Sequence, residues 1–117
     1  CMHADSRAVL WDALHAGRLV QSFVGGTTFD VYDTDDLLRS AVERQLGIVG
    51  EALNKLAKVD PQTASAIAEL PRIVGFRNVL VHGYATVDNR LVWRIVEDHL
   101  PALLDRLEEL LPSENER

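Results

Sequence analysis

Apolar residues recur at intervals of three and four along most of the chain, which is the spacing of one face of an α-helix. This pattern predicts a first helix over residues 4–23 and a second over residues 36–57. It also predicts a motif helix that begins at Pro71, a residue suited to a first turn, and a last helix from residue 89 or 90 to about residue 111. No segment carries a convincing strand pattern, so we predict an all-α protein.

Shorter segments join these four helices. Residues 27–36 form an acidic connection with room for one short helical turn, and residues 60–70 form a short Ala-rich helical piece. Pro101 interrupts the last helix, and we expect a gentle kink there because its ring displaces one backbone hydrogen bond. The pattern therefore predicts a four-helix bundle with a short extra helical segment before the motif helix, in one domain over residues 1–117 with a frayed tail from residue 112.

Two glycines lie inside the second predicted helix. Gly47 and Gly50 each cost up to about 1 kcal/mol relative to alanine in a helix interior. We expect such glycines where another backbone comes close. Glu51 follows at once, and it faces either the functional site or a partner, or else is a solvated surface acid.

Composition and charge narrow the class of protein. The 117 residues fit one domain, and 47% apolar with 26% charged residues is ordinary for a globular protein. The single cysteine excludes an internal disulfide and a cysteine-based zinc site. A formal net charge of −6 argues against broad electrostatic binding of nucleic acid, DNA included, and favours a protein partner. No apolar run approaches the roughly 20 residues that span a bilayer, and no signal peptide is visible, so we expect a cytoplasmic protein without membrane contact.

Four aspartates in the acidic connection are the sharpest candidates for a metal site. They are Asp30, Asp33, Asp35 and Asp36. The segment lacks the central glycine and the terminal glutamate of a calcium hand. Thr34 or Asp35 suits the cap of the helix that follows, where a side-chain oxygen accepts from free backbone N–H groups. We expect no metal and no other cofactor.

The segment from Arg77 to Tyr84 concentrates the groups that can do chemistry. On a helix, Asn78 and His82 are four residues apart and share a face, with Arg77 beside them. The aliphatic residues 79–81 between them are expected to face the core. Arg77, Asn78 and His82 would then border one polar patch.

These side chains suit phosphodiester chemistry that needs no metal. Histidine exchanges protons near neutral pH, and Gly83 predicts a helix end whose carbonyl groups favour the charged form of His82. Arg77 is always charged and can hold a phosphate with two hydrogen bonds. The structural alternative is that Arg77 caps carbonyls or pairs with an acid, and that His82 is a half-buried residue with satisfied hydrogen bonds.

The pattern Arg-Asn-x-x-x-His-x-Tyr over residues 77–84 resembles the signature of the HEPN superfamily, and the final Tyr is similar to that of the HepT-like toxins. The Gly50-Glu51-Ala52 segment before it fits the same family. One departure is the Leu70-Pro71-Arg72 segment, where many relatives carry Ile-Pro-Trp. Arg72 thus replaces a packing aromatic with a cation near the site, which could alter contacts with RNA or a partner.

The resemblance implies a metal-independent endoribonuclease toxin that works as a homodimer and is paired with an MntA-like nucleotidyltransferase antitoxin. The motif helices would meet near a two-fold axis, so that His82 of one subunit is the base for an RNA 2′-hydroxyl and His82 of the other is the acid for the leaving group. Arg77 would stabilise charge on the phosphoryl oxygens, and Asn78 would orient His82 or bind phosphate.

The resemblance also marks Tyr84 as a target of adenylylation by the antitoxin. The added AMP would place bulk and negative charge beside Arg77 and His82 and keep RNA phosphate out. Alternatively, Tyr84 is a half-buried residue that closes the helix end through its hydroxyl. Two other functions stay open: a catalytically idle HEPN-like dimeric adaptor, and a nucleotide-binding module in which Arg77 holds phosphate without turnover.

Overall fold

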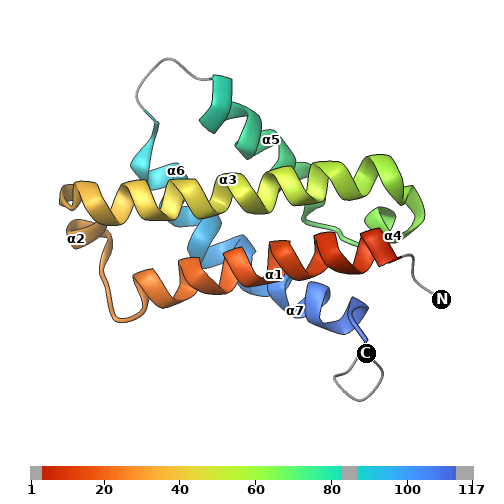
Figure 1. Ribbon diagram of the computed structural model, residues 1–117. Helices are drawn as coiled ribbons and strands as arrows, with labels where there is room; N and C mark the ends of the chain where they lie inside the picture. The colour runs from red at the N-terminus through yellow and green to blue at the C-terminus, as the bar shows by residue number, and fades with distance from the viewer. Residues whose placement is uncertain (1–3, 83–86, 113–117) are drawn as a thin grey trace.

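The computed structural model describes residues 4–82 and 87–112, and every regular element among them is helical (Figure 1). The two longest helices, α1 (Ala4–Val24) and α3 (Asp36–Val59), pack along one another. The motif helix α5 (Leu70–His82) packs against α3. The fourth long segment runs through α6 (Asn89–Arg94), η1 (Ile95–His99) and α7 (Leu100–Leu110). The predicted all-α bundle is therefore confirmed.

Two short helices lie in the connections between the long ones. The acidic connection contains α2 (Phe29–Thr34), and the segment before the motif helix contains α4 (Pro61–Ser65), the extra helical piece that the sequence predicts. Asp60 caps α4 by accepting from the Thr63 backbone N–H at 3.1 Å. The buried hydroxyl of Ser6 donates to the same carboxylate at 2.8 Å, which ties the start of α1 to this corner.

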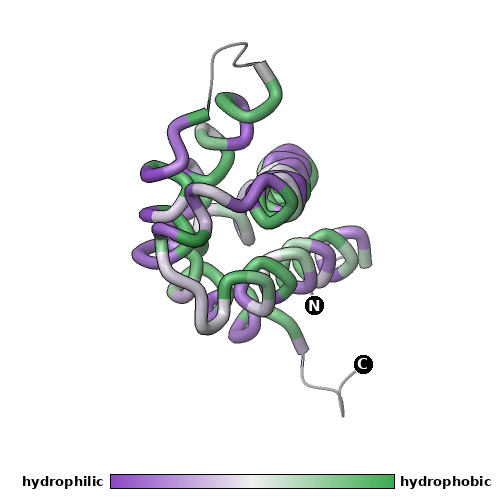
Figure 2. Tube along the Cα trace, turned by 90° about the vertical axis from the view of Figure 1, so that its left-hand side faces the viewer, coloured by the Kyte–Doolittle hydropathy of each residue, from purple (hydrophilic) through white to green (hydrophobic). Residues whose placement is uncertain are grey.

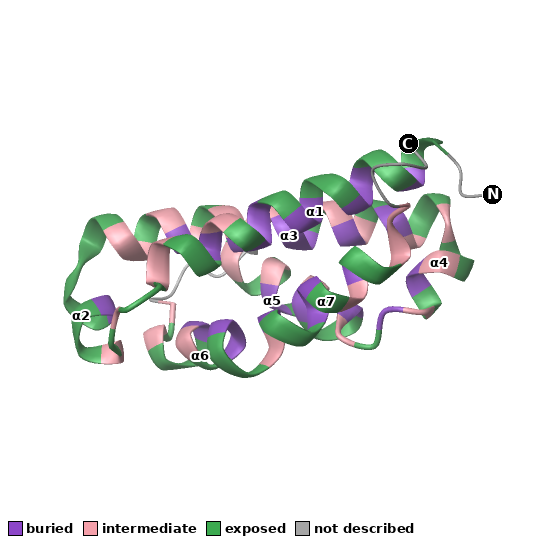
Figure 3. Cartoon of the chain, turned by 90° about the horizontal axis from the view of Figure 1, so that it is seen from below, coloured by how far each residue is buried: buried purple, intermediate pink, exposed green. Residues whose placement is uncertain are grey.

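The core lies between the inward faces of the long helices. Figure 3 shows the buried positions recurring along each helix among exposed ones, and Figure 2 shows apolar and polar residues alternating along the trace in the same way. The largest fully buried side chains on the long helices include Leu10, Leu46, Leu53, Leu100 and Leu103. None of the helices in the described part of the chain is long and apolar enough to cross a membrane.

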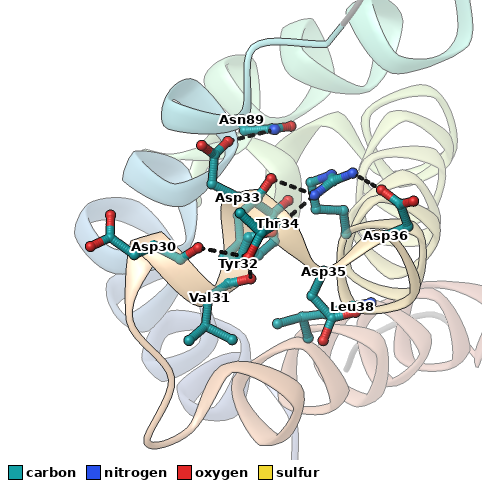
Figure 4. A network of polar contacts seen from close by, with 10 residues as sticks. Asp30, Val31, Tyr32, Asp33, Thr34, Asp35, Asp36, Leu38 and Asn89 are labelled. Carbon is teal, nitrogen blue, oxygen red and sulfur yellow. Dashed lines mark hydrogen bonds and ion pairs between the residues drawn. The ribbon is translucent and has the colours of Figure 1, made fainter.

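The acidic connection is held by capping and ion pairing (Figure 4). Asp35, one of the two residues predicted for this role, caps α3 by accepting from the Leu38 backbone N–H at 3.0 Å. Arg39 pairs with Asp36 and donates to the carbonyl of Asp33 at 2.6 Å. Among residues 4–82 and 87–112, no three His, Cys, Asp or Glu side chains are grouped so that they could hold a metal ion.

The interruption at Pro101 takes the form of a π-helical turn. The Leu100 N–H donates to the carbonyl of Ile95, five residues earlier, instead of the usual four. Proline itself has no N–H, so widening the turn ahead of it lets the chain continue into α7. Apart from Pro112, the predicted frayed tail lies outside the described residues.

Candidate functional site

The candidate site begins where α5 packs against α3 (Figure 1). At this contact Arg77 lies directly over Gly50. A Cβ atom built on Gly50 would lie 2.2 Å from Arg77 Cβ and 3.4 Å from the carbonyl oxygen of Ile73. Only a residue without a side chain lets the two helices approach this closely. The expectation for Gly50 is therefore confirmed.

The same expectation is wrong for Gly47. A Cβ atom built there meets no atom within 4 Å. Gly47 lies three residues before Gly50 on the same side of α3, but no atom of α5 comes that close to it. It lines a surface hollow instead.

The guanidinium of Arg77 is held at the junction of α3 and α5. Its Nη2 lies 3.4 Å from Glu51 Oε1, and its Nη1 donates to Asn78 Oδ1 at 3.2 Å. Its Nε is buried without a hydrogen-bond partner among the described residues. The Arg77 side chain is only 20% exposed, whereas that of Glu51 is 55% exposed. Glu51 thus lies beside the motif and at the same time remains exposed to solvent.

The structure places the remaining motif residues only in part. Asn78 is exposed on α5, and the backbone of His82 ends the same helix four residues later. The His82 side chain, together with Gly83 and Tyr84, lies outside the described residues. The described site therefore brings together Arg77, Asn78 and Glu51, and the parts assigned to His82 and Tyr84 stay predictions.

The aliphatic residues of the motif do not all face the core. Val79 is 49% exposed and Val81 is 50% exposed, so the prediction that residues 79–81 pack inward is wrong for these two. The core face of α5 follows the helical spacing through Ile73 and Phe76, which leaves Val79 and Val81 on the flanks. The motif consequently carries an apolar surface beside its polar one.

A hollow of about 220 Å³ opens between α3 and α5 next to the motif. Leu80 and Val81 line it from α5, and Glu43 and Glu51 line it from α3. Burial raises the pKa of the Glu43 carboxyl above its ordinary value, and the nearby Arg39 opposes that shift. Sequence reasoning missed Glu43, although it lies eight residues before Glu51 and so projects from the same side of a helix.

Arg72, the departure from the family pattern, lies at the start of α5. Its Nε is 3.6 Å from Glu69 Oε2, and the same oxygen is 3.1 Å from His99 Nδ1. The cation is therefore paired with an acid one turn away. The side chain of His99 is 22% exposed, and its contact with Glu69 links η1 to this corner.

The comparisons with known proteins agree with the motif. Residues 13–110 match the family described as HepT-like, "Ribonuclease HepT-like". A "Putative RNase" of Methanocaldococcus jannaschii is 30% identical over 104 residues, covering 89% of this chain and 94% of its own. The "Probable ribonuclease HepT" of Thermococcus cleftensis is 29% identical over 115 residues, covering 93% of this chain and 98% of its own. No solved structure matches the chain.

Proposed function

The chain belongs to the HepT-like ribonuclease family, and from this premise we propose that it is a metal-independent endoribonuclease toxin of a toxin–antitoxin pair. It cleaves RNA by attack of a 2′-hydroxyl at a site composed from two copies of the chain. A nucleotidyltransferase antitoxin neutralises it by adenylylating Tyr84. The observation that carries the proposal is the position of Arg77, whose stem packs on Gly50 while its guanidinium contacts Glu51 and Asn78.

Arg77 supplies the fixed positive charge that phosphoryl transfer needs. Its stem is packed against α3, so the guanidinium is oriented before substrate arrives and need not reorganise during the reaction. A phosphate oxygen that approaches Arg77 would replace the long 3.4 Å contact with Glu51 and gain a shorter, charge-assisted bond. Asn78, bonded to the same guanidinium, is placed to bind phosphate or to orient His82.

His82 carries the proton transfers in this proposal. One imidazole takes the proton from the 2′-hydroxyl, whose oxygen attacks the phosphorus, and a second imidazole gives a proton to the departing 5′-oxygen. The product ends are a 2′,3′-cyclic phosphate and a 5′-hydroxyl. One chain offers a single His82, so a two-fold dimer supplies the second.

The exposed apolar residues of α5 support the homodimer. Val79 and Val81 are half-exposed and flank Asn78 on a helix whose polar groups are proposed to act across the two-fold axis. Pairing two copies through this helix would bury the valines and bring two Arg77 guanidinium groups to one cleft.

Neutralisation by the antitoxin acts at the same cleft. The phenolate oxygen of Tyr84 attacks the α-phosphate of ATP, pyrophosphate leaves, and the retained AMP adds negative charge beside Arg77.

The proposal is tested by RNA cleavage in excess chelator with purified protein of recorded intact mass. Wild type should give 2′,3′-cyclic phosphate ends, and His82→Ala and Arg77→Ala should each reduce cleavage by about 100-fold or more. His99→Gln is the control, because it removes a histidine that pairs with Glu69 instead. Unmodified wild type that cleaves no RNA would refute the nuclease and favour the adaptor. Added mass in multiples of AMP at Tyr84 would identify the neutralised form.

The composite site is tested by refolding wild type together with increasing proportions of His82→Ala. If each site needs His82 from both subunits, activity falls as the square of the wild-type fraction. A linear fall would mean that each subunit acts alone, and it would contradict the shared cleft while leaving the nuclease intact.

A further inference from the structure

The outer face of α1 carries an exposed pair of stacked rings. Trp11 is 48% exposed, and its ring lies 5.0 Å from that of His15 with only 9° between the two planes. Tryptophan is usually well buried, and the core side of α1 is already filled by neighbours such as Leu10 and Leu14. The position of Trp11 is therefore not explained by the packing of the bundle.

Hollows adjoin the stacked pair on both sides. One, of about 360 Å³, is lined by Trp11, Arg7 and Leu111 and lies where α1 approaches the end of α7. The other, of about 350 Å³, runs between α1 and α3 and is lined by His15 and Lys55 among others. A flat ring could therefore lie against the pair without displacing the core.

The second hollow leads to the candidate site. Glu51 lines it together with His15, and Glu51 also lines the hollow beside α5 and pairs with Arg77. Glu51 thus connects the hollow beside His15 with the guanidinium of Arg77 on the other side of α3. Figure 1 shows this order of elements, with α3 between α1 and α5.

We propose that this face binds the single-stranded part of the RNA substrate, with bases stacked on Trp11 and His15 while the chain leads to Arg77. The inference rests on the proposed function and adds the substrate class. Aromatic stacking selects single strands because their bases are free, whereas the bases of a duplex are already stacked. It also explains how a chain of net charge −6 engages RNA without a broad basic surface.

Positive and negative side chains are balanced in the two hollows beside Trp11 and His15. This balance distinguishes the proposed RNA-binding face from a basic nucleic-acid surface. Arg7 and Lys55 are opposed by Asp12 and Glu51 in the same two hollows. Few phosphates would be neutralised, so RNA affinity should depend only weakly on salt. A basic nucleic-acid surface would show the opposite behaviour.

The test uses a 2′-O-methyl oligouridine of about twelve nucleotides, which cannot be cleaved, and follows binding by fluorescence anisotropy of the labelled RNA. Wild type should bind this single strand better than a duplex of equal length. Trp11→Ala should weaken binding about tenfold, the scale of one lost stacked base. Leu37→Ala is the matched control, since Leu37 is 81% exposed at the start of α3 and lines none of these hollows. In a Trp93→Phe background Trp11 is the sole tryptophan, and its fluorescence should be quenched by the RNA.

Three results would overturn the inference: equal affinity of Trp11→Ala and wild type, preference for the duplex, or a steep salt dependence. Loss of self-association in Trp11→Ala, seen by sedimentation with RNA binding unchanged, would assign the face to a second copy of the chain. Failure of the proposed nuclease is distinguishable, because the binding assay needs no cleavage. If the nuclease is real, Leu37→Ala should still cleave a dinucleotide at the wild-type rate, whereas Arg77→Ala should not.

Discussion

Arg77 occupies the space in which a side chain at Gly50 would begin, since a Cβ atom there would lie 2.2 Å from Arg77 Cβ. One glycine therefore sets both the distance between α3 and α5 and the place of the cation. The helix penalty of Gly50 is offset by this close approach. Gly50 and Arg77 therefore contribute both to the packing of the bundle and to the candidate site.

Gly50→Ala should disturb both the packing of α5 on α3 and the position of Arg77. The new methyl group forces α5 or the Arg77 stem to move, and overpacking of this kind costs about 1–3 kcal/mol. Cleavage should fall more than stability alone explains, because Arg77 shifts from its place. Urea unfolding and cleavage rates measured well below the unfolding midpoint check the two effects separately.

Gly47→Ala is the control for that change. It makes the same substitution on the same helix, where a Cβ atom meets nothing within 4 Å. The variant should gain about 0.5–1 kcal/mol from helix propensity and keep its activity. Equal effects of the two substitutions would contradict the close approach at Gly50.

Arg77→Lys tests whether the planar guanidinium matters beyond its charge. Lysine keeps a cation and most of the stem, but it cannot make the two-pronged contact with phosphate. We expect the cleavage rate to fall by about 100-fold. Stability should change by less than about 1 kcal/mol, because the ion pair with the 55% exposed Glu51 contributes little. Wild-type turnover by Arg77→Lys would show that a point charge suffices.

Tyr32→Phe should leave the fold as stable or make it more so. Tyr32 is fully buried, and its hydroxyl has no hydrogen-bond partner among the described residues. Removing an unpaired buried hydroxyl relieves a penalty of about 1 kcal/mol or more, while the ring contact with Trp93 is kept. A clear fall in the thermal midpoint would show that the hydroxyl has a partner.

The buried phenol of Tyr32 should make the folded protein less stable at alkaline pH. Burial, and then the charge of Glu43, raise the pKa of the Tyr32 phenol well above its ordinary value. The folded chain therefore holds this proton more tightly than the unfolded chain, so stability falls as pH rises past about 10, where the unfolded tyrosine ionises. Tyr32→Phe should lose less stability there, as measured by urea unfolding from pH 8 upward.

Glu43→Gln should change how stability depends on acid pH. Burial raises the pKa of Glu43 in the folded chain, so its protonated form is favoured there. Its contribution is present below the pKa of about 4.3 of an unfolded glutamate and is lost as pH rises through the higher folded value. The advantage of Glu43→Gln over wild type should therefore grow from pH 4 towards neutrality. A difference that is constant with pH would contradict the burial of this carboxyl.

The sequence by itself determined the elements of this protein. Helical spacing of apolar residues predicted the long helices, and the pair Thr34 and Asp35 predicted where α3 starts. The motif order placed Arg77 and Asn78 together on one helix. These properties depend on residues within a turn or two of each other, where helix geometry fixes the neighbours. The prediction of a close approach held for Gly50 and failed for Gly47, since the helix penalty is the same for both glycines.

Only the tertiary structure decided what lies against what. Glu51 and Arg77 are 26 positions apart, and whether the acid meets the cation depends on the packing of α5 on α3. The same packing decides that Gly50 is covered while Gly47 is open, and that Val79 and Val81 stay half-exposed. Spacing along the sequence predicts which residues share one face of a helix. Which face the next helix covers depends on how whole helices fit together, and that follows from all their contacts at once.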